Sequence, residues 1–314
     1  MKDFNQFTLK QLVEAPEKIF HKLRWKNGLA CPKCGSVAIR THDSLHHCRD
    51  CHNVFSDRSG TIFHSCKLPT DKTLTAIYFF VSNTRGISSY QLARHIGTTQ
   101  FTAWRLLTKL RSAIKYEVQL SGNIVLDELY LGGDFRWKPL HKKLPPNIYA
   151  NYRDYTTAQL KNFIQEYSAQ VKMPTLGIVG TDRILFRRRS VTLRACIDNA
   201  VSKANVKAIV NPFVKDPTRL ITDGSSLYPS LAKSWKVPHS VCDHGSYIYQ
   251  STDGYSSSCV EQLFSQVRRM FSGTYTFASR KYLQGYLDEC ALRYNMRGYS
   301  NSERFRIFSR LVFW

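Results

Sequence analysis

The stretch NIVLDELYLGG, residues 123 to 133, decides the expected fold, because it is an apolar run that carries two adjacent acids. A mostly hydrophobic run with β-branched residues that closes on a glycine pair is typical of a buried strand. An unpaired carboxylate in such a strand costs several kcal/mol. Successive strand side chains point to opposite faces, so Asp127 and Glu128 cannot both enter one cleft. One acid is therefore a catalytic candidate, and the other is a candidate for an ion pair or a hydrogen bond.

The chain around this stretch is long and basic. Its 314 residues are 43% hydrophobic, which suffices for two or three folded units. A total of 45 Lys and Arg against 23 Asp and Glu gives a formal net charge of +22. Such an excess is expected of a protein that binds a polyanion, and nucleic acid is the first candidate. The sequence has no apolar span near ~20 residues and no signal-peptide pattern, so we expect a soluble, cytoplasmic protein without a membrane partner.

Two Cys-x-x-Cys pairs lie near the N-terminus, separated by thirteen residues: Cys31 and Cys34, then Cys48 and Cys51. Two such turns complete a tetrahedral cage of sulfur ligands that stabilises a fold too small for its own core. Closed four-sulfur sites are structural, so the spacing predicts structural Zn²⁺. The alternative is a set of free buried cysteines that happen to have this spacing. The other five of the nine cysteines are scattered singly, which favours reduced thiols over disulfides.

The stretch ISSYQLARHIGTTQFTAWRLLTKLRSAI predicts a helix that starts near Ser88, a turn at Gly97 and a second helix. The apolar residues of the second helix are expected to face inward: Phe101, Trp104, Leu107 and Leu110. This order of elements is typical of a helix-turn-helix, whose second helix can enter a major groove. The alternative is a plain helical hairpin in a core. If the helix meets DNA, the candidate contacts are Gln100, Arg105 and Lys109.

From about residue 120 the pattern changes to strands mixed with helices. The predicted strands are 123–133, 175–181, 183–191, 219–224 and 236–242, and the end of the chain is helical. The predicted organisation is a helical lead-in over 1–27, a zinc ribbon over 28–66, a helix-turn-helix DNA-binding region over 67–118 and a catalytic domain over 119–314 that carries a basic insertion around 135–174. The fold class is α/β (α+β).

Two further acids complete a pattern. Asp223 ends the apolar run RLITD, and strand-end acids lie where active sites form. Glu261 lies in the helix SCVEQLFSQVRRMF, on one edge of its buried stripe with Ser265 and Arg268. Converging carboxylates repel one another by roughly 4 kcal/mol at ~4 Å and an effective dielectric of 20. Divalent cations offset that repulsion, and oxygen ligands suit Mg²⁺ or Mn²⁺. The alternative is that these acids are helix caps or salt-bridge partners.

The blocks DELYLGG, TDGSSLYPSL, VEQLFSQVRR, YLDECALRYNMR and LRWKNGLACPKCG are similar to those of bacterial insertion-sequence transposases of the ISXO type. The resemblance covers most of the chain. It implies a zinc ribbon joined to an RNase H-like DDE core, with double-stranded DNA as substrate and two catalytic Mg²⁺ or Mn²⁺ ions. It also implies assembly of two or more copies on DNA and association with the bacterial nucleoid.

By this resemblance Asp127 and Asp223 are the first two metal-binding acids, and Glu261 matches the acidic helix position. We assign Asp127 to the metal cleft and Glu128 to a supporting contact, with the swap as the alternative. Many relatives carry Asn where this chain has Ser258, which makes Ser258 an alternative third ligand. The secondary catalytic candidates also include His244, which matches a family histidine, and Arg268, which falls where the family usually has Lys. Arg268 and Arg269 are both expected to contact DNA.

The expected function is that of a DNA transposase that binds the ends of its element, cleaves there and joins the freed 3′-hydroxyl to target DNA. An RNase H-like nuclease or resolvase without strand transfer is one alternative. A DNA-binding regulator with a catalytically dead core is the other. The three differ in whether cleavage occurs and whether joined product follows.

Overall fold

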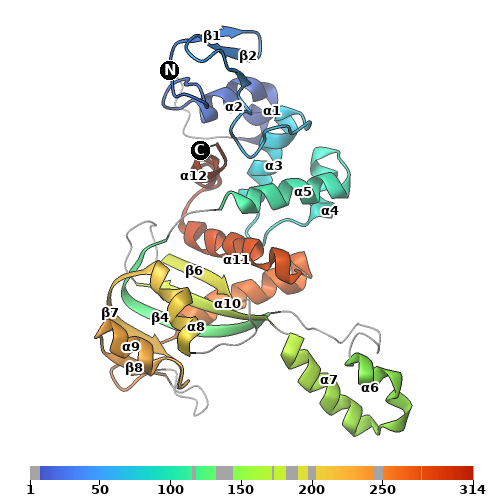
Figure 1. The fold of residues 1–314 in the computed structure, drawn as a ribbon, viewed down its shortest axis with the longest axis vertical. Coiled ribbons are helices and arrows are strands. Elements are labelled where there is room, and N and C mark those ends of the chain that lie inside the picture. Colours follow the sequence, from blue (N-terminus) through green and yellow to red (C-terminus); the bar gives the residue numbers. More distant parts are fainter. Residues whose placement is uncertain are drawn as a thin grey trace. The chain divides into compact units, whose positions relative to one another are not determined.

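The structure, a computed structural model, describes residues 8–114, 118–131, 144–171, 173–181, 190–196, 203–242, 250–276 and 278–313. The chain divides into two compact units. Unit 1 contains Met1–Tyr116, Ser272–Tyr275 and Leu292–Trp314, and unit 2 contains Glu117–Phe271 and Thr276–Ala291. Figure 1 labels most of the elements of both units.

Unit 1 begins with two short helices, as the N-terminal pattern predicts. Helix α1 (Leu9–Glu14) starts at a capping box on Thr8, and α2 (Pro16–Arg24) has its proline at the first turn, where no amide hydrogen is needed. A three-stranded antiparallel sheet follows, with the order β1 (Ile39–His42), β2 (Leu45–Cys48) and β3 (Val54–Ser56). Its small core is centred on Cys31, Cys48 and Phe55.

Three helices come next in unit 1: α3 (Thr70–Ser82), α4 (Ser89–Ile96) and α5 (Gln100–Ser112). Ser88 caps α4 by accepting a hydrogen bond from the Gln91 amide, and Gly97 ends the helix in the left-handed conformation. Thr99 then caps α5, so α4 and α5 are joined by the short turn that the sequence predicts.

One local prediction in these helices is wrong. Phe101 does not face inward: it is 61% exposed and stacks on Trp104, with ring centroids 6.1 Å apart. The buried stripe of α5 instead runs through Ala103, Leu107 and Leu110, because side chains three and four residues apart share a helix face.

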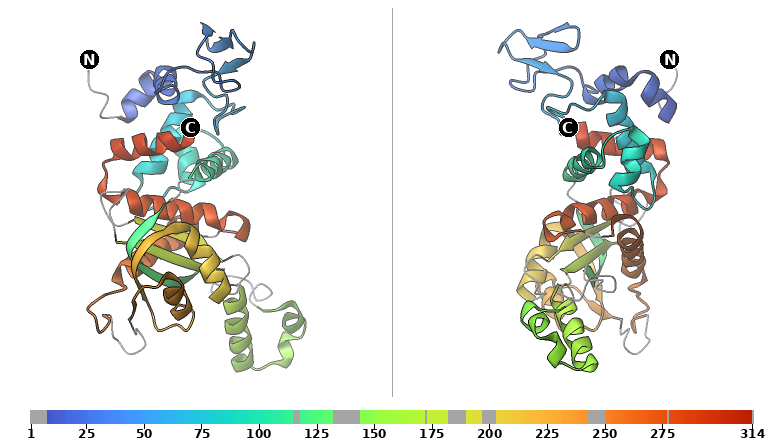
Figure 2. Two further views of the ribbon diagram at one scale, coloured as in Figure 1. Left: turned by 60° about the vertical axis from the view of Figure 1, so that its left-hand side comes forward. Right: turned by 90° about the vertical axis from the view of Figure 1, so that its right-hand side faces the viewer.

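The C-terminal helix α12 (Asn301–Phe313) belongs to unit 1 and lies beside α2 and α3 in the views of Figure 1 and Figure 2. The rings of Phe20 and Phe313 meet edge to face with centroids 4.7 Å apart. The Arg24 guanidinium donates to the Phe313 carbonyl at 2.5 Å. The predicted catalytic domain extends to residue 314, whereas this packing places the last helix with the N-terminal elements.

Unit 2 is built on a five-stranded mixed sheet with the order β6-β5-β4-β7-β8. Its strands are β4 (Leu120–Leu131), β5 (Met173–Gly180), β6 (Ser190–Ala195), β7 (Val214–Thr222) and β8 (His239–Val241). The first strand, β4, is central. On one side β5 pairs antiparallel with β4 and β6 pairs antiparallel with β5, and on the other side β7 and β8 run parallel to β4. This confirms the expected α/β fold with an RNase H-like mixed sheet. Most of the predicted strand 183–191 lies outside the described residues.

Helices cover the sheet of unit 2. Helix α10 (Ser258–Met270) packs on β4 and β5, and α9 (Pro229–Trp235) packs on β7 beside α8 (Lys203–Val210). Helix α11 (Arg280–Asn295) holds the β6 edge, where Gln284 donates to the Leu193 carbonyl and accepts from the Ala195 amide. The boundary between the units falls within α11. These contacts fix both the central strand and the helix that carries Glu261.

The predicted basic insertion includes two helices, α6 (Pro146–Ala150) and α7 (Thr157–Val171). Residues 135–143 and 172 of the insertion lie outside the described part of the chain. Among the described residues, no helix combines the length and the apolarity needed to cross a bilayer.

Candidate functional site

Four cysteines from two knuckles converge in the ribbon of unit 1. The sulfur of Cys31 lies 3.6 Å from that of Cys51, and the sulfur of Cys34 lies 3.6 Å from that of Cys48. All four sulfur atoms lie within 4.8 Å of one another. A tetrahedral site with Zn–S bonds of about 2.3 Å separates its sulfurs by about 3.8 Å, so this group has the size of a zinc site.

Backbone amides favour the thiolate form of Cys31 and Cys48, one cysteine of each knuckle. The Ser36 amide acts in the same direction on Cys34, but hydrogen bonds with the neighbouring cysteines raise the pKa of that thiol. Burial opposes ionisation of Cys31, but hydrogen bonds from the amides of Cys34 and Lys33 outweigh it and lower the pKa of the thiol to about 6. The amide of Cys51 lowers the pKa of Cys48 in the same way. Thiolates are the form that binds zinc. The four-sulfur donor set and its hydrogen bonds therefore fit a structural zinc ion.

A second cluster, which the sequence did not predict, joins the ribbon to α2. Oδ1 of Asp57 accepts from the indole of Trp25 at 2.7 Å, and it lies 2.8 Å from Nε2 of His46 and 3.0 Å from Nδ1 of His21. His46 is buried, and its Nδ1 lies 3.0 Å from the hydroxyl of Thr41. These partners come from α2, β1, β2 and the segment after β3. Their spacing in sequence carries no signal, because only the fold brings them together.

The two aspartates of the predicted catalytic set follow neighbouring parallel strands. Val125 of β4 pairs with Ile221 of β7. Continuing this register by two residues puts Asp127 beside Asp223, one position beyond the end of β7. Partners in register share one face of a sheet, so both side chains are expected on the face of Val125. Oδ1 of Asp127 accepts from the Glu128 amide at 2.7 Å, and Oδ1 of Asp223 accepts from the Ser225 amide at 3.1 Å.

That face of the sheet is the one that α10 covers. Asp127 pairs with Gly177 across β4 and β5. A Cβ added to Gly177 would lie 2.5 Å from the Phe264 ring and 2.9 Å from Val260. Both of these residues belong to the buried stripe of α10, which carries the half-buried Glu261 one residue after Val260. The missing side chain at Gly177 therefore allows α10 to approach the strand that carries Asp127.

Glu128 faces the other side of β4. Its carboxylate accepts from the hydroxyl of Tyr228 at 2.9 Å and from that of Tyr130 at 3.3 Å. Tyr228 is fully buried. Burial raises the pKa of Tyr228, and the charges of Glu128, Asp223 and Asp127 raise it further. The buried phenol of Tyr228 thus lies within electrostatic range of the carboxylates of Glu128, Asp223 and Asp127.

The three predicted metal ligands do not form a closed group as they stand. Asp127, Asp223 and Glu261 are all described, yet they are absent from the sets whose ligand atoms lie within 4.8 Å of one another. Each aspartate is turned to a nearby backbone amide. Their shared feature is the face of the sheet and not a preformed cage.

The remaining candidates on α10 all lie on its exposed side. Ser258 and the arginines Arg268 and Arg269 are exposed, and Arg269 donates to the Ser265 hydroxyl at 3.0 Å. Ser258 lies at the first turn of α10, and its amide donates to Ser256. His244 lies outside the described residues.

The candidate DNA contacts of α5 also differ. The amide group of Gln100 donates to Ser89 at 2.8 Å and so ties α5 to α4. Arg105 is exposed and lies over the Phe101 ring, with its guanidinium carbon 5.8 Å from the centroid. Lys109 is half-buried one turn further along. Arg105 and Lys109 also line a common hollow.

Comparison with known proteins identifies both parts of the chain. Residues 119–295 match the ISXO2-like transposase domain, and residues 14–54 match the transposase zinc-ribbon domain. A protein described as an uncharacterized protein in transposable element ISH50, from Halobacterium salinarum, is 22% identical over 257 residues, which cover 80% of each chain. Because the domain match spans more than half of its length, the chain belongs to the family of transposases with an ISXO2-like transposase domain.

Proposed function

We propose that this protein is a DDE transposase that binds the ends of an insertion sequence, cleaves the DNA there and transfers the freed 3′-hydroxyl to a target. The observation that supports the proposal is the parallel pairing of β4 and β7 up to Val125 and Ile221. Continued by two residues, this register would put Asp127 beside Asp223 on the face that α10 covers. Membership of the transposase family supports the same chemistry.

In this proposal Asp127, Asp223 and Glu261 hold the catalytic ions. Carboxylate oxygens are the ligands that Mg²⁺ and Mn²⁺ prefer, so the donor set fits. When bound, two such ions activate a water or a 3′-hydroxyl and stabilise the leaving oxygen. The local amide hydrogen bonds orient the two aspartates, both of which are half-buried. The hydroxyl of Ser258 is a weaker ligand for a hard cation than the Glu261 carboxylate.

Glu128 is assigned a positioning role. Its hydrogen bond from Tyr228 fixes the strand on the opposite face and compensates the buried charge. The zinc ribbon and the α4–α5 pair are assigned to DNA binding, with a helix-turn-helix in which α5 meets the groove. Joining two element ends requires at least two copies of the chain on DNA.

The test incubates the protein with Mg²⁺, labelled element ends and a target plasmid. Asp223→Asn should abolish cleavage and joining while DNA binding is retained, because the substitution removes a ligand charge and keeps the shape. Asp216→Asn is the matched control: it lies on the same strand, is exposed and should remain active.

Three other outcomes would contradict the proposal in different ways. Cleavage without joined product would indicate a nuclease or resolvase. Activities that are unchanged in Asp223→Asn would remove this acid from the chemistry. DNA binding without any cleavage by the wild type would indicate a regulator.

A further inference from the structure

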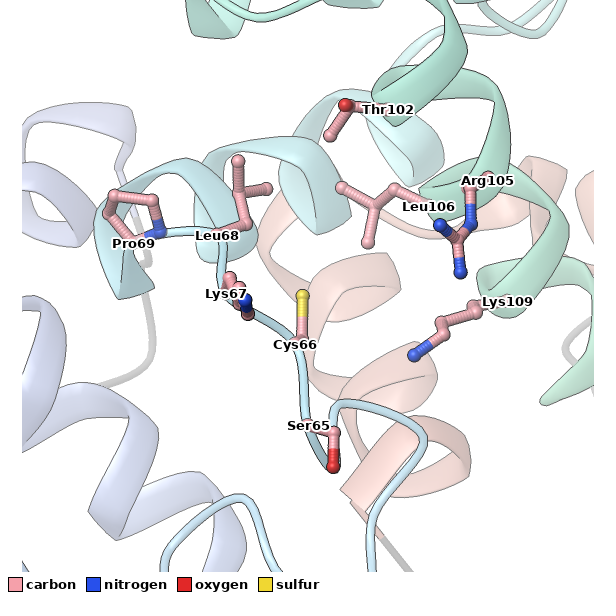
Figure 3. A pocket seen from close by; sticks show the side chains of 9 residues that line it. All are labelled: Ser65, Cys66, Lys67, Leu68, Pro69, Thr102, Arg105, Leu106 and Lys109. Carbon is pink, nitrogen blue, oxygen red and sulfur yellow. The ribbon is translucent and has the colours of Figure 1, made fainter.

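A hollow of about 540 Å³ lies between α5 and the segment that follows the zinc ribbon, both within unit 1. Ser65, Cys66 and Lys67 line it from the segment, and Thr102, Arg105 and Lys109 line it from α5. Figure 3 shows the side chains of Arg105 and Lys109 extending from α5 toward the connecting segment that carries Cys66. Two stretches that are about forty residues apart in sequence thus form one concave surface.

The hollow is positively charged. Its lining includes three cationic side chains and no carboxylate. Within the described part of the chain, no ion pair joins Lys67, Arg105 or Lys109 to an acid. Like charges that converge without a counter-charge repel one another, and a bound anion would relieve that repulsion. The site is the electrostatic opposite of the acid pair in unit 2.

We propose that this hollow binds a backbone phosphate of DNA, held jointly by Lys67, Arg105 and Lys109. The inference rests on the proposed DNA-binding function and adds a site to it. Ser65 and Thr102 also line the hollow, and the Thr102 hydroxyl lies 2.9 Å from that of Thr99. Hydroxyl groups of this kind are common donors to phosphate oxygens. The apolar side chains of Leu68 and Leu106 give the hollow a wall against which a sugar can pack.

The segment Ser65 to Pro69 links the proposed phosphate site on α5 to the zinc ribbon. Ser65 to Pro69 connects the zinc-ribbon sheet to α3, because β3 ends at Ser56 and α3 begins at Thr70. A phosphate bound between this segment and α5 therefore positions the zinc ribbon and the α4–α5 pair on the same DNA strand. Such contacts position a protein and carry no base information.

The first test measures DNA affinity of the full chain as a function of salt. Each neutralised phosphate contributes roughly −0.9 to the slope of log K against log salt. Lys67→Gln should lower the magnitude of the slope by about that amount, equally for element-end and unrelated DNA. Lys18→Gln is the control, because it removes the same charge from an exposed position on α2, outside the hollow.

The second test uses Cys66 as a reporter, because the other described cysteines outside the zinc set are buried. The quantity to compare is the rate of Cys66 alkylation by anionic iodoacetate divided by the rate with neutral iodoacetamide. In the zinc-loaded proteins, this ratio should be higher for wild type than for Lys67→Gln. Duplex DNA should slow alkylation by both reagents. Inorganic phosphate is added in a parallel arm to separate a free anion from the DNA backbone.

The outcomes separate this inference from the proposed function. A wild-type chain that binds no DNA removes the DNA part of the proposed function itself. If wild type binds DNA but Lys67→Gln and Lys18→Gln change the slope equally, or DNA leaves Cys66 unprotected, the phosphate site is wrong and the transposase proposal stands. Protection by inorganic phosphate and not by DNA would also overturn the DNA assignment. A reduced slope in Lys67→Gln alone, together with protection by DNA, supports the site.

Discussion

Tyr228 and Tyr130 donate to the same carboxylate, that of Glu128, from very different environments. Tyr228 is fully buried and its hydroxyl is 2.9 Å away, whereas Tyr130 is 52% exposed and 3.3 Å away. A hydrogen bond to a charged group contributes about 1.5–3 kcal/mol, and water can replace only the exposed donor. Tyr228→Phe should therefore lower the stability of unit 2 by about that amount.

Amide hydrogen exchange in β4 and α9 measures this effect, and Tyr130→Phe is the matched control. We expect faster exchange in Tyr228→Phe and little change in Tyr130→Phe. Equal effects of the two substitutions would show that Glu128 is not compensated from the buried side.

Asp57 predicts a pH dependence for the ribbon. Burial alone would raise the pKa of Asp57, but hydrogen bonds from His46 and Trp25 and the interaction with His21 outweigh it and lower the pKa. A lowered pKa in the folded state stabilises the fold above the unfolded pKa, near 3.9, and this contribution is lost as the pH falls through the folded pKa. Asp57→Asn should therefore be less stable than wild type at neutral pH, with a difference that disappears in acid.

Thermal unfolding of the two proteins, followed by amide hydrogen exchange in the ribbon strands β1 to β3, measures that difference. Zinc loss in acid affects both proteins, so the difference between them is the informative quantity. A difference that stays constant from pH 7 to acid would contradict the assignment of the hydrogen bonds to the charged form of Asp57.

At the scale of elements, the approach of α10 to the sheet depends on Gly177. An alanine there would place its Cβ against the Phe264 ring and Val260. Overpacking of this kind costs about 1–3 kcal/mol. Gly177→Ala should lower stability by that amount and reduce strand transfer, because α10 carries Glu261. Gly224→Ala is the control, since its nearest neighbour would lie 4.0 Å away. Full activity and stability of Gly177→Ala would contradict the proposed coupling of α10 to β4.

The sequence predicted most of these elements, because their signals are local. The apolar run 123–133, the proline of α2 and the cap at Ser88 each act within a few residues. Phe101 was placed wrongly because an apolar spacing of three and four fits more than one helix face. Helical periodicity indicates that one face of a helix is buried. When further apolar residues lie beside that face, periodicity does not show which face it is.

At the scale of the whole chain, the sequence predicted four of the five strands of the mixed sheet, and β6 (Ser190–Ala195) overlaps the predicted strand 183–191 only at its end. It did not predict contacts between residues that are far apart in the sequence. An amphipathic helix signals that one face is covered without naming what covers it. The placement of α12 with the N-terminal helices, and the cluster of His21, His46 and Asp57, depend on such distant contacts. The zinc site was predictable because its ligand spacing is itself a local pattern.

The central claim is that Asp127, Asp223 and Glu261 share cations on the α10 face of β4, and Mn²⁺ binding to the protein on element-end DNA tests it most directly. Electron paramagnetic resonance titration should find strong Mn²⁺ binding to wild type and to Glu128→Gln, whose side chain lies on the other face. It should find weakened binding to Asp127→Asn, Asp223→Asn and Glu261→Gln. Loss of Mn²⁺ binding in Glu128→Gln but not in Asp127→Asn, or no binding by wild type, would contradict the claim.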